Sequence, residues 1–284
     1  MIFMTLLFIE ALIAALLAGS LCGVLGTYLR KLGLLTLCFT VAHAALAGAA
    51  FSILFSTPPE LTAFSFSVIA AFIVEILYYK IGIEREIISM CTFSLSSALA
   101  MFAIYMVPSV TLTSETASLI LWGSILAATP AKIILLTFLS ISLIIYILSF
   151  KLEIDTLLFD IKLAEAEGVN IQFHSTVLLV LTAIAISIIL KLTGGFLVFA
   201  LLFNPIAAVE RLSYKRQPLL GGIVGGISGI IGVVISYVFD TPIGATIAVT
   251  ASLMLITGVS ISSVLEYLRK KNLKTVLNNF NPYN

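Results

Sequence analysis

The sequence predicts an all-α, polytopic membrane protein of about eight to nine transmembrane helices, and its composition, its charge pattern and its turn residues predict it. The chain has 284 residues, of which 61% are hydrophobic and 10% are charged, and its mean hydropathy is +1.19. A soluble domain carries about 25% charged residues. The charges are clustered and leave uncharged stretches long enough for helices of about 20 residues to cross roughly 30 Å of hydrocarbon. This composition excludes a nucleic-acid-binding domain, a disulfide scaffold and a secreted enzyme.

Nine apolar segments follow one another along the chain: 3–29, 32–56, 62–79, 87–107, 131–150, 173–190, 195–209, 218–239 and 243–266. Turn signals separate several of them, at Pro58-Pro59, Pro108, Gly194-Gly195 and Pro242. The first segment has no basic residue before it, so it is expected to be a retained helix rather than a signal peptide. The seventh segment is short, which is why eight or nine spans are expected.

The basic residues predict the orientation of the chain. All 15 Lys and Arg residues except Lys132 and Lys191 fall in one set of alternate connections. These connections are 30–31, 80–86, 151–172, 210–217 and the tail from 267. Basic residues are retained on the cytoplasmic face of the plasma membrane. We therefore expect the N-terminus outside and the C-terminus inside, with residues 1–266 as one transmembrane domain and 267–284 as a cytoplasmic tail.

Small residues in the eighth segment predict close helix packing. Gly221, Gly225 and Gly229 follow one another at every fourth position, and Gly232 continues the cluster. This spacing lets two helices approach closely in lipid. A phosphate-cradling loop is the alternative, but no Lys-Ser or Lys-Thr follows, as a P-loop requires. The cysteines show no CxxC spacing and are expected to be small hydrophobic side chains: Cys22, Cys38 and Cys91.

One connection, residues 151–172, is longer than the others. Asp160 is expected to be the N-cap of a short helix and Gly168 its C′ glycine, with good helix formers between them. A capped cytoplasmic helix between two spans suits docking of another protein. An incidental helix at the membrane interface is the alternative.

Phe159-Asp160 followed by Ala164-x-Ala166-x-Gly168 resembles the coupling-helix signature of the metal-importing ABC permeases, the zinc and manganese family known as ABC-3. Four further stretches resemble this family in the same order along the chain. They are His43-Ala-Ala-Leu-Ala-Gly48, Trp122-Gly-Ser-Ile-Leu126, Gly195-Phe-Leu-Val through Asn204-Pro205-Ile-Ala-Ala, and Gly232-x-x-x-Ser236-Tyr237-x-x-Asp240-x-Pro242-x-Gly244. Together they cover most of residues 20–260.

The resemblance implies an ABC importer permease architecture. Such a chain is half of a dimeric pore in the lipid bilayer, so a second permease copy is an expected partner. The coupling helix, with Asp160, Ala164, Ala166 and Gly168, would rest on a cytoplasmic ABC ATPase and transmit its closure. An extracellular metal-binding, solute-binding protein would deliver the substrate, a divalent metal ion: zinc first, then manganese or iron. The partner subunit would use the ATP, so this chain is expected to be no enzyme and to bind no cofactor.

The family pattern implies a metal-binding pair, Asp-x-x-x-His, on the second segment, where this spacing puts both side chains on one helical face. His43 matches the histidine, but Phe39 stands where the acid is expected. His43 is therefore a pore ligand acting with its counterpart in the second copy, a buried histidine bonded to a neighbouring helix, or a residue that serves a non-metal substrate. An intramembrane ionisable residue favours a function. Two imidazoles near a two-fold axis favour zinc over manganese, which prefers oxygen ligands.

Asn204 is a second candidate on the ion path. Pro205 removes a backbone hydrogen bond and frees a carbonyl one turn earlier, and exposed carbonyl oxygens of a broken helix can line an ion path. The alternative is a packing kink in which Asn204 is bonded locally.

Three other polar residues have simpler expected roles. Glu75 lies close to the cytoplasmic end of its segment and is expected to pair with Lys80 or to reach the interface. Asp240 precedes Pro242 and is expected to cap a helix or form a turn. His174 lies at the inner interface and is expected to be solvated.

Three rival functions remain open. A permease of the same architecture could carry a non-metal solute, since Phe39 replaces the expected acid. A secondary transporter would need paired intramembrane charges and inverted repeats, and neither is evident. An intramembrane enzyme would need a catalytic dyad, and His43 has no acid within one helical turn.

Overall fold

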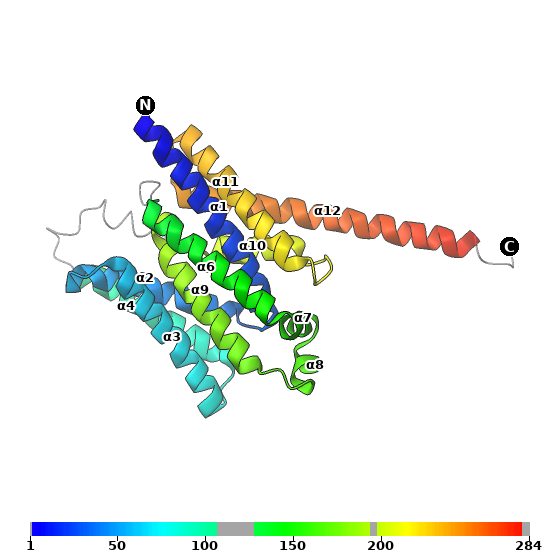
Figure 1. The fold of residues 1–284 in the computed structure, drawn as a ribbon, viewed down its shortest axis with the longest axis horizontal. Coiled ribbons are helices and arrows are strands. Elements are labelled where there is room, and N and C mark those ends of the chain that lie inside the picture. Colours follow the sequence, from blue (N-terminus) through cyan, green and yellow to red (C-terminus); the bar gives the residue numbers. More distant parts are fainter. Residues whose placement is uncertain (1, 107–127, 194–197, 280–284) are drawn as a thin grey trace.

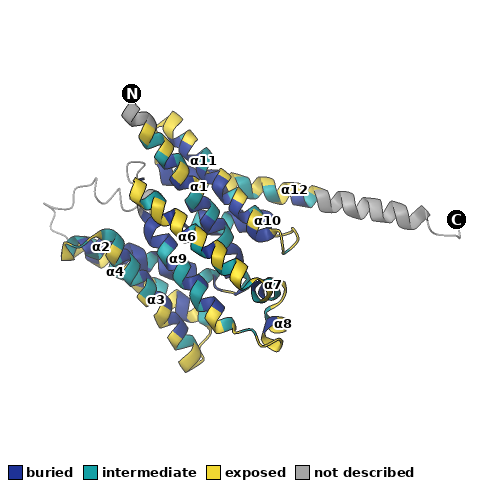
Figure 2. Cartoon of the chain, in the orientation of Figure 1, coloured by how far each residue is buried: buried dark blue, intermediate teal, exposed yellow. Residues whose placement is uncertain are grey.

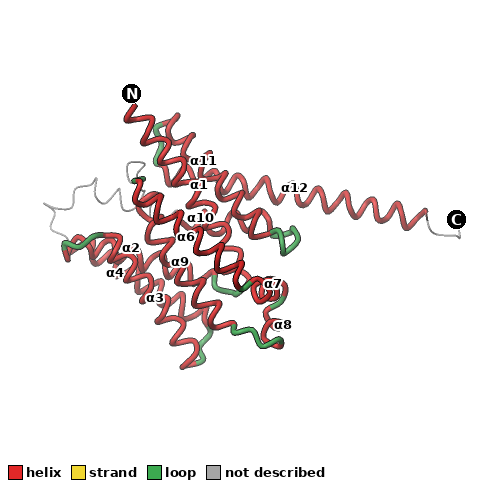
Figure 3. Tube along the Cα trace, viewed as in Figure 1, coloured by secondary structure: helices red, strands yellow, loops and turns green. Residues whose placement is uncertain are grey.

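The computed structural model describes residues 2–106, 128–193 and 198–279, and every regular element in these ranges is a helix (Figures 1 and 3). The helices are α1 (Ile2–Lys31), α2 (Leu35–Phe55), α3 (Pro59–Ile81), α4 (Arg85–Met106), α6 (Pro130–Ser149), α7 (Lys151–Phe159), α8 (Ile161–Ala166), α9 (Ile171–Thr193), α10 (Val198–Val209), α11 (Gln217–Phe239) and α12 (Ile243–Asn279). Residues 108, 122–126 and 194–195, which carried turn or motif predictions, lie outside the described ranges.

Eight of the described helices are long and apolar enough to cross a membrane: α1, α2, α3, α4, α6, α9, α11 and α12. The seventh predicted segment corresponds to α10, which has 12 residues and is therefore about 18 Å long. The predicted all-α polytopic fold of eight to nine spans is confirmed for the described part of the chain. α12 has 37 residues, so helical backbone continues past residue 266 into the expected tail.

The ends of the helices follow from turn chemistry. Pro59 and Pro130 occupy the first turns of α3 and α6, where a missing N–H is tolerated. Gly82 ends α3 with a φ of +73°, a conformation that glycine adopts without strain. Asp240 ends α11 with a φ of +52°, so it forms the turn that was expected before Pro242.

α1 and α11 are antiparallel and pack closely against each other at glycine positions, where no side chain separates the two backbones. A Cβ on Gly225 would lie 2.1 Å from the carbonyl oxygen of Gly19, and a Cβ on Gly229 would lie 2.4 Å from that of Ala15. On Gly221 it would lie 2.9 Å from the carbonyl oxygen of Gly23. Three of the predicted packing glycines therefore lie at this close helix contact. The remaining one, Gly232, lies against Ile247 of α12.

Burial distinguishes central helices from peripheral ones (Figure 2). In the most apolar 18-residue stretch of α2, 78% of the residues are buried, whereas in that of α6 only 17% are buried. Most exposed side chains of α6 are large and apolar, among them Phe138 and Leu148, as expected for a helix that faces lipid. α2 is thus the most enclosed span, and the candidate metal ligand His43 lies on it.

Four of the basic connections lie together at one end of the helices. Arg30 at the end of α1 forms an ion pair with Glu210 at the end of α10. The ring of Phe159 lies 5.3 Å from that of Tyr214, which joins the 151–172 connection to the 210–217 connection. Residues of the α1–α2 turn, of the α3–α4 turn and of the range 161–172 line one cavity, so the 80–86 connection also lies at this end. The structure therefore groups these connections as the charge pattern predicts.

Candidate metal path and coupling segment

His43 lies where three helices meet. On α2, its Nδ1 is 3.0 Å from the Ser97 hydroxyl of α4. Its ring lies edge-on to Phe93 of α4, with centroids 4.4 Å apart, and stacks on Phe199 of α10 at 5.6 Å. His43 is half-buried. Its neighbours, which the sequence did not predict, are mainly aromatic.

The hydrogen bonds of Ser97 indicate the tautomer of His43. The Ser97 hydroxyl donates to the carbonyl oxygen of Phe93 at 2.9 Å, and a hydroxyl has a single proton to give. Nδ1 of His43 is then the donor toward the Ser97 oxygen, which places the ring lone pair on Nε2. A neutral imidazole binds metal ions through the ring nitrogen that carries no proton, either Nε2 or Nδ1, and a hydrogen bond at the other nitrogen holds such a ring in place.

Phe39 fills the position where an acid was expected. Its ring stacks on Phe199 at 4.6 Å and on Phe203 at 4.8 Å, both on α10, and meets Phe93 edge-on at 6.4 Å. The path candidate is therefore a histidine beside a cluster of phenylalanines. Within the described residues, no group of three or more His, Cys, Asp or Glu side chains is placed to hold a metal ion.

Asn204 is held by a neighbouring helix. Its Nδ2 donates to the Ser252 hydroxyl of α12 at 3.0 Å, and Ser252 in turn donates to the carbonyl of Ala248. Pro205 is buried inside α10, which continues through it to Val209. This geometry favours the packing interpretation, because the amide of Asn204 joins α10 to α12.

Residues 151–172, the segment expected to couple to an ATPase, are called the coupling segment. Its short helix α8 has the caps that the sequence indicates. The Asp160 carboxylate accepts hydrogen bonds from the backbone N–H groups of Lys162 and Leu163 at 2.7 and 3.1 Å. Gly168 has a φ of +81°, and the N–H of Val169 donates to the carbonyl of Ala164. These bonds form an N-cap and a Schellman C-terminus around α8.

The two alanines of this signature face in different directions. Ala164 is 0% exposed and belongs to the hydrophobic core, whereas Ala166 is exposed. Ala166 is therefore accessible to another protein, and Ala164 holds α8 against the membrane domain.

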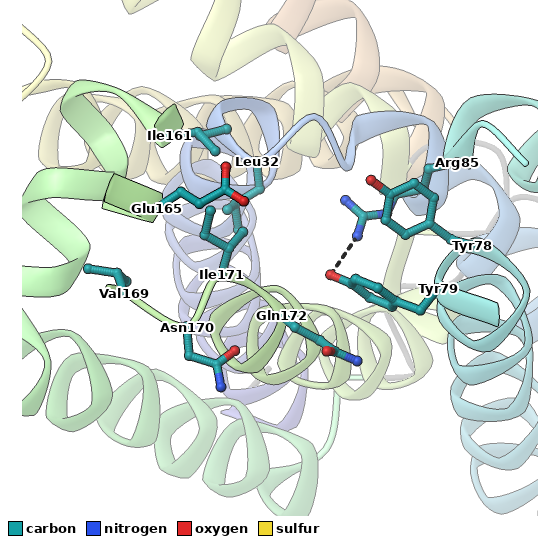
Figure 4. A pocket seen from close by; sticks show the side chains of 10 residues that line it. All are labelled: Leu32, Tyr78, Tyr79, Arg85, Ile161, Glu165, Val169, Asn170, Ile171 and Gln172. Carbon is teal, nitrogen blue, oxygen red and sulfur yellow. Dashed lines mark hydrogen bonds between the residues drawn. The ribbon is translucent and has the colours of Figure 1, made fainter. Parts of the chain in front are cut away.

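Figure 4 shows a cavity of about 470 Å³ next to α8. Glu165 lies on one wall, and Tyr78, Tyr79 and Arg85 lie on the opposite wall, with Gln172 between them. The Arg85 guanidinium lies 4.1 Å from the ring centre of Tyr78 and donates to the Tyr79 hydroxyl at 3.3 Å. The coupling segment and the α3–α4 turn thus face each other across open space.

Glu75 pairs with Arg85, so the expected pairing with Lys80 was wrong. The nitrogen–oxygen distance is 3.2 Å, and the side chains of Glu75 and Arg85 are 7% and 15% exposed. Arg85 is ten positions away, in the next helix. It reaches Glu75 because the α3–α4 turn folds the two helices together, which spacing along the sequence does not reveal.

His174 is fully buried, so the expectation of a solvated side chain was also wrong. Its Nε2 lies 2.6 Å from a Glu153 carboxylate oxygen, and its Nδ1 lies 2.6 Å from the Tyr146 hydroxyl. Sequence reasoning missed this cluster, because its three members belong to three helices and form no motif.

This chain is similar to known proteins over most of its length. The family model described as "ABC 3 transport family" matches residues 4–262. The manganese transport system membrane protein MntC of Listeria innocua is 29% identical over 86% of this chain and 87% of its own length. The manganese import system permease protein ScaB of Streptococcus gordonii is 26% identical over 92% and 94%.

Two solved structures share the fold. PsaBC from Streptococcus pneumoniae, in complex with Fab, matches with a TM-score of 0.78 and 25% identity over 92% of this chain and 94% of that chain. A putative metal-chelate type ABC transporter in an inward-facing conformation matches with a TM-score of 0.70 and 17% identity over 91% and 85%. With a family match over nearly its whole length, this chain belongs to the ABC 3 transport family.

Proposed function

We propose that this chain is the membrane-spanning permease subunit of an ATP-driven importer of divalent metal ions in the plasma membrane. The observation that carries the proposal is the family match over residues 4–262, which includes both the coupling segment and the helix of His43. Two similar proteins are named as manganese transport or import proteins. The chain pairs with a second permease copy to form the pore, with its N-terminus outside and its C-terminus in the cytoplasm.

The closure of the ATPase is transmitted to the membrane domain through α8. A cytoplasmic ATPase subunit binds ATP and docks on the exposed side of α8, at Ala166 and its neighbours, while the caps at Asp160 and Gly168 keep the helix short and rigid. The cavity between α8 and the α3–α4 turn leaves room for α8 to move when the ATPase closes. An extracellular metal-binding, solute-binding protein delivers the ion to the outer mouth of the pore.

Two observations favour different metal ions. An imidazole with its lone pair on Nε2 suits zinc, and two copies of His43 would supply two such ligands. The named relatives favour manganese, which prefers oxygen ligands. We place zinc first on the ligand chemistry of His43, then manganese and iron.

A permease of the same architecture for a non-metal solute is the second candidate. It is favoured by the ring of Phe39, which packs against Phe199 and Phe203 where a carboxylate would serve a cation. An apolar, aromatic lining is typical of sites for organic ligands.

Uptake by proteoliposomes tests both candidates. The vesicles contain this chain with its ATPase and binding protein, and zinc, manganese and iron are compared with and without ATP. ATP-driven accumulation of one metal, reduced by His43→Ala at equal expression, is the expected result. No accumulation of any metal while the ATPase remains active would reject the metal proposal and favour the second candidate.

A further inference from the structure

Side chains from three helices meet at the base of the coupling segment, where two of them bind the buried imidazole of the third. Tyr146 comes from α6, Glu153 from α7 and His174 from α9. Both ring nitrogens of His174 lie 2.6 Å from their partners, and the ring is 0% exposed. A buried histidine with both nitrogens bonded is fully satisfied, so the cluster is a defined structural unit.

Aromatic rings enclose the same imidazole. Phe150 lies edge-on to it with centroids 5.4 Å apart, and Phe173 lies edge-on at 5.3 Å. The Phe150 ring also lies 5.3 Å from the ring of Tyr146. This apolar surrounding keeps water from the imidazole ring, whereas the Glu153 side chain is 45% exposed on the far side of its bond.

The cluster spans the bend between α6 and α7. Phe150 ends α6 and begins α7 with φ and ψ of −109° and 32°, and α7 leaves at an angle to α6 (Figure 1). Tyr146 lies before the bend and Glu153 after it, and both bind the same imidazole. The two hydrogen bonds therefore link the helices on either side of the bend.

The cluster also closes the coupling segment at its base. Glu153 and His174 are 21 positions apart, and the residues between them contain the rest of α7, all of α8 and the turn into α9. α7 buries Ile154, Leu157 and Leu158, and α8 buries Ala164. The contact between Glu153 and His174 therefore joins the two ends of this segment.

We propose that Tyr146, Glu153 and His174 form a clamp that makes the coupling segment transmit its motion to α6 and α9 together. They are positioning residues: the clamp touches neither metal nor ATP and acts through the geometry of the helices. This inference rests on the proposed function, because it requires that α8 receives the motion of an ATPase. If the clamp is lost, a push on α8 bends the chain at Phe150 instead of moving the spans.

The first test measures metal ions imported per ATP hydrolysed, in proteoliposomes that contain the complete transporter. Tyr146→Phe removes only a hydroxyl, and Glu153→Ala removes the acceptor for Nε2. Both should preserve complex assembly and ATP hydrolysis but lower the ratio by about two- to thirtyfold, the range that coupling mutations produce. Glu153→Gln keeps an oxygen acceptor and should stay near the wild-type ratio.

Two further comparisons separate a clamp from general destabilisation. The double variant Tyr146→Phe/Glu153→Ala should lower the ratio no more than the stronger single variant, since both break one unit. Tyr237→Phe and Glu84→Ala are matched controls on exposed side chains and should leave the ratio unchanged. Wild-type ratios in both single clamp variants would overturn the proposal.

A second measurement does not depend on metal transport. Spin labels are placed on α7 and α9 with Leu152→Cys and Gln172→Cys, two exposed positions, after Cys91→Ser removes the exposed native thiol. With the clamp intact, the distance between the labels should be the same before and after ATP binding; with Glu153→Ala, it should shift or broaden. Equal distance distributions with and without the clamp would overturn the inference. Absence of metal import with the expected distances would reject the proposed function alone.

Discussion

Phe39 and His43 lie one turn apart on α2, and both rings stack on the single ring of Phe199 in α10, with centroid distances of 4.6 and 5.6 Å. The aromatic cluster thus occupies the position beside the histidine where a carboxylate would complete a pair of metal ligands. Phe39 is therefore the position at which a test of metal preference is most direct.

Phe39→Asp should change the metal preference of the transporter. The new carboxylate would lie on the same helical face as His43, and oxygen ligands favour manganese over zinc. We expect the manganese-to-zinc uptake ratio to rise by about tenfold, which corresponds to about 1.4 kcal/mol. Competition uptake with both metals measures this ratio. Phe39→Ala is the control that removes the ring without adding an acid, and an equal ratio in both variants would contradict the prediction.

Gly225→Ala should destabilise the membrane domain. Its Cβ would lie 2.1 Å from the backbone oxygen of Gly19, and a backbone atom cannot turn aside as a side chain can. Overpacking of this kind costs about 1–3 kcal/mol, so the Tm in detergent should fall. Leu219→Ala is the control, because it also introduces an alanine into the same helix, at a side chain that is 67% exposed. The prediction fails if Gly225→Ala melts at or above the temperature of that control.

Ala166→Arg should weaken binding of the ATPase without disturbing the membrane domain. Ala166 is exposed on α8, so a long cation there obstructs a docking partner while no internal contact is lost. Co-purification of the ATPase subunit should drop, and the Tm of the isolated chain should stay the same. Asp240→Asn, at the end of α11, is the control for a change of charge. Full co-purification with Ala166→Arg would argue that α8 is an incidental interfacial helix.

Ala164→Arg should behave differently, although it lies two positions away in the same signature. Ala164 is 0% exposed, and an arginine there has no room among the buried residues of α7 and α9. Burying an unpaired charge is strongly unfavourable, so we expect a lower Tm in addition to loss of the ATPase. A variant that loses the ATPase at an unchanged Tm would show that Ala164 faces the partner instead.

Arg85→Gln should lower the stability of the protein more than removal of both charges of the Glu75–Arg85 pair does. The Glu75 side chain is 7% exposed, and loss of its guanidinium partner leaves a buried carboxylate uncompensated. Breaking one partner of a buried pair costs about 3–5 kcal/mol, whereas replacing both is often nearly neutral. Thermal unfolding of Arg85→Gln and of Arg85→Gln/Glu75→Gln measures the difference. Equal Tm values for the two variants would mean that the pair contributes nothing measurable.

Local rules made much of the architecture predictable. Uncharged stretches predict spans because each helix satisfies its own backbone hydrogen bonds in lipid, and the eight long helices follow those stretches. Asp160 and Gly168 were correctly placed at the ends of a short helix, since caps depend only on residues within one turn.

The buried polar clusters were not predictable in the same way. The partners of Glu75 and His174 come from other helices, and no spacing along the chain brings them together. Their positions depend on how the helices pack, since a polar group buried in lipid or protein takes whichever partner the packing provides. The same holds for Ala164 and Ala166, which one signature joins and the packing of α8 separates.

The sequence by itself therefore determined the helical class, the order of the spans, the grouping of the basic connections and the family. Each of these depends on composition or on contacts within one or two turns. Only the tertiary structure decided what lies beside His43, which acid Arg85 holds and that His174 joins α6, α7 and α9. Those facts depend on contacts between helices that are distant along the chain, and such contacts exist only once the helices have packed.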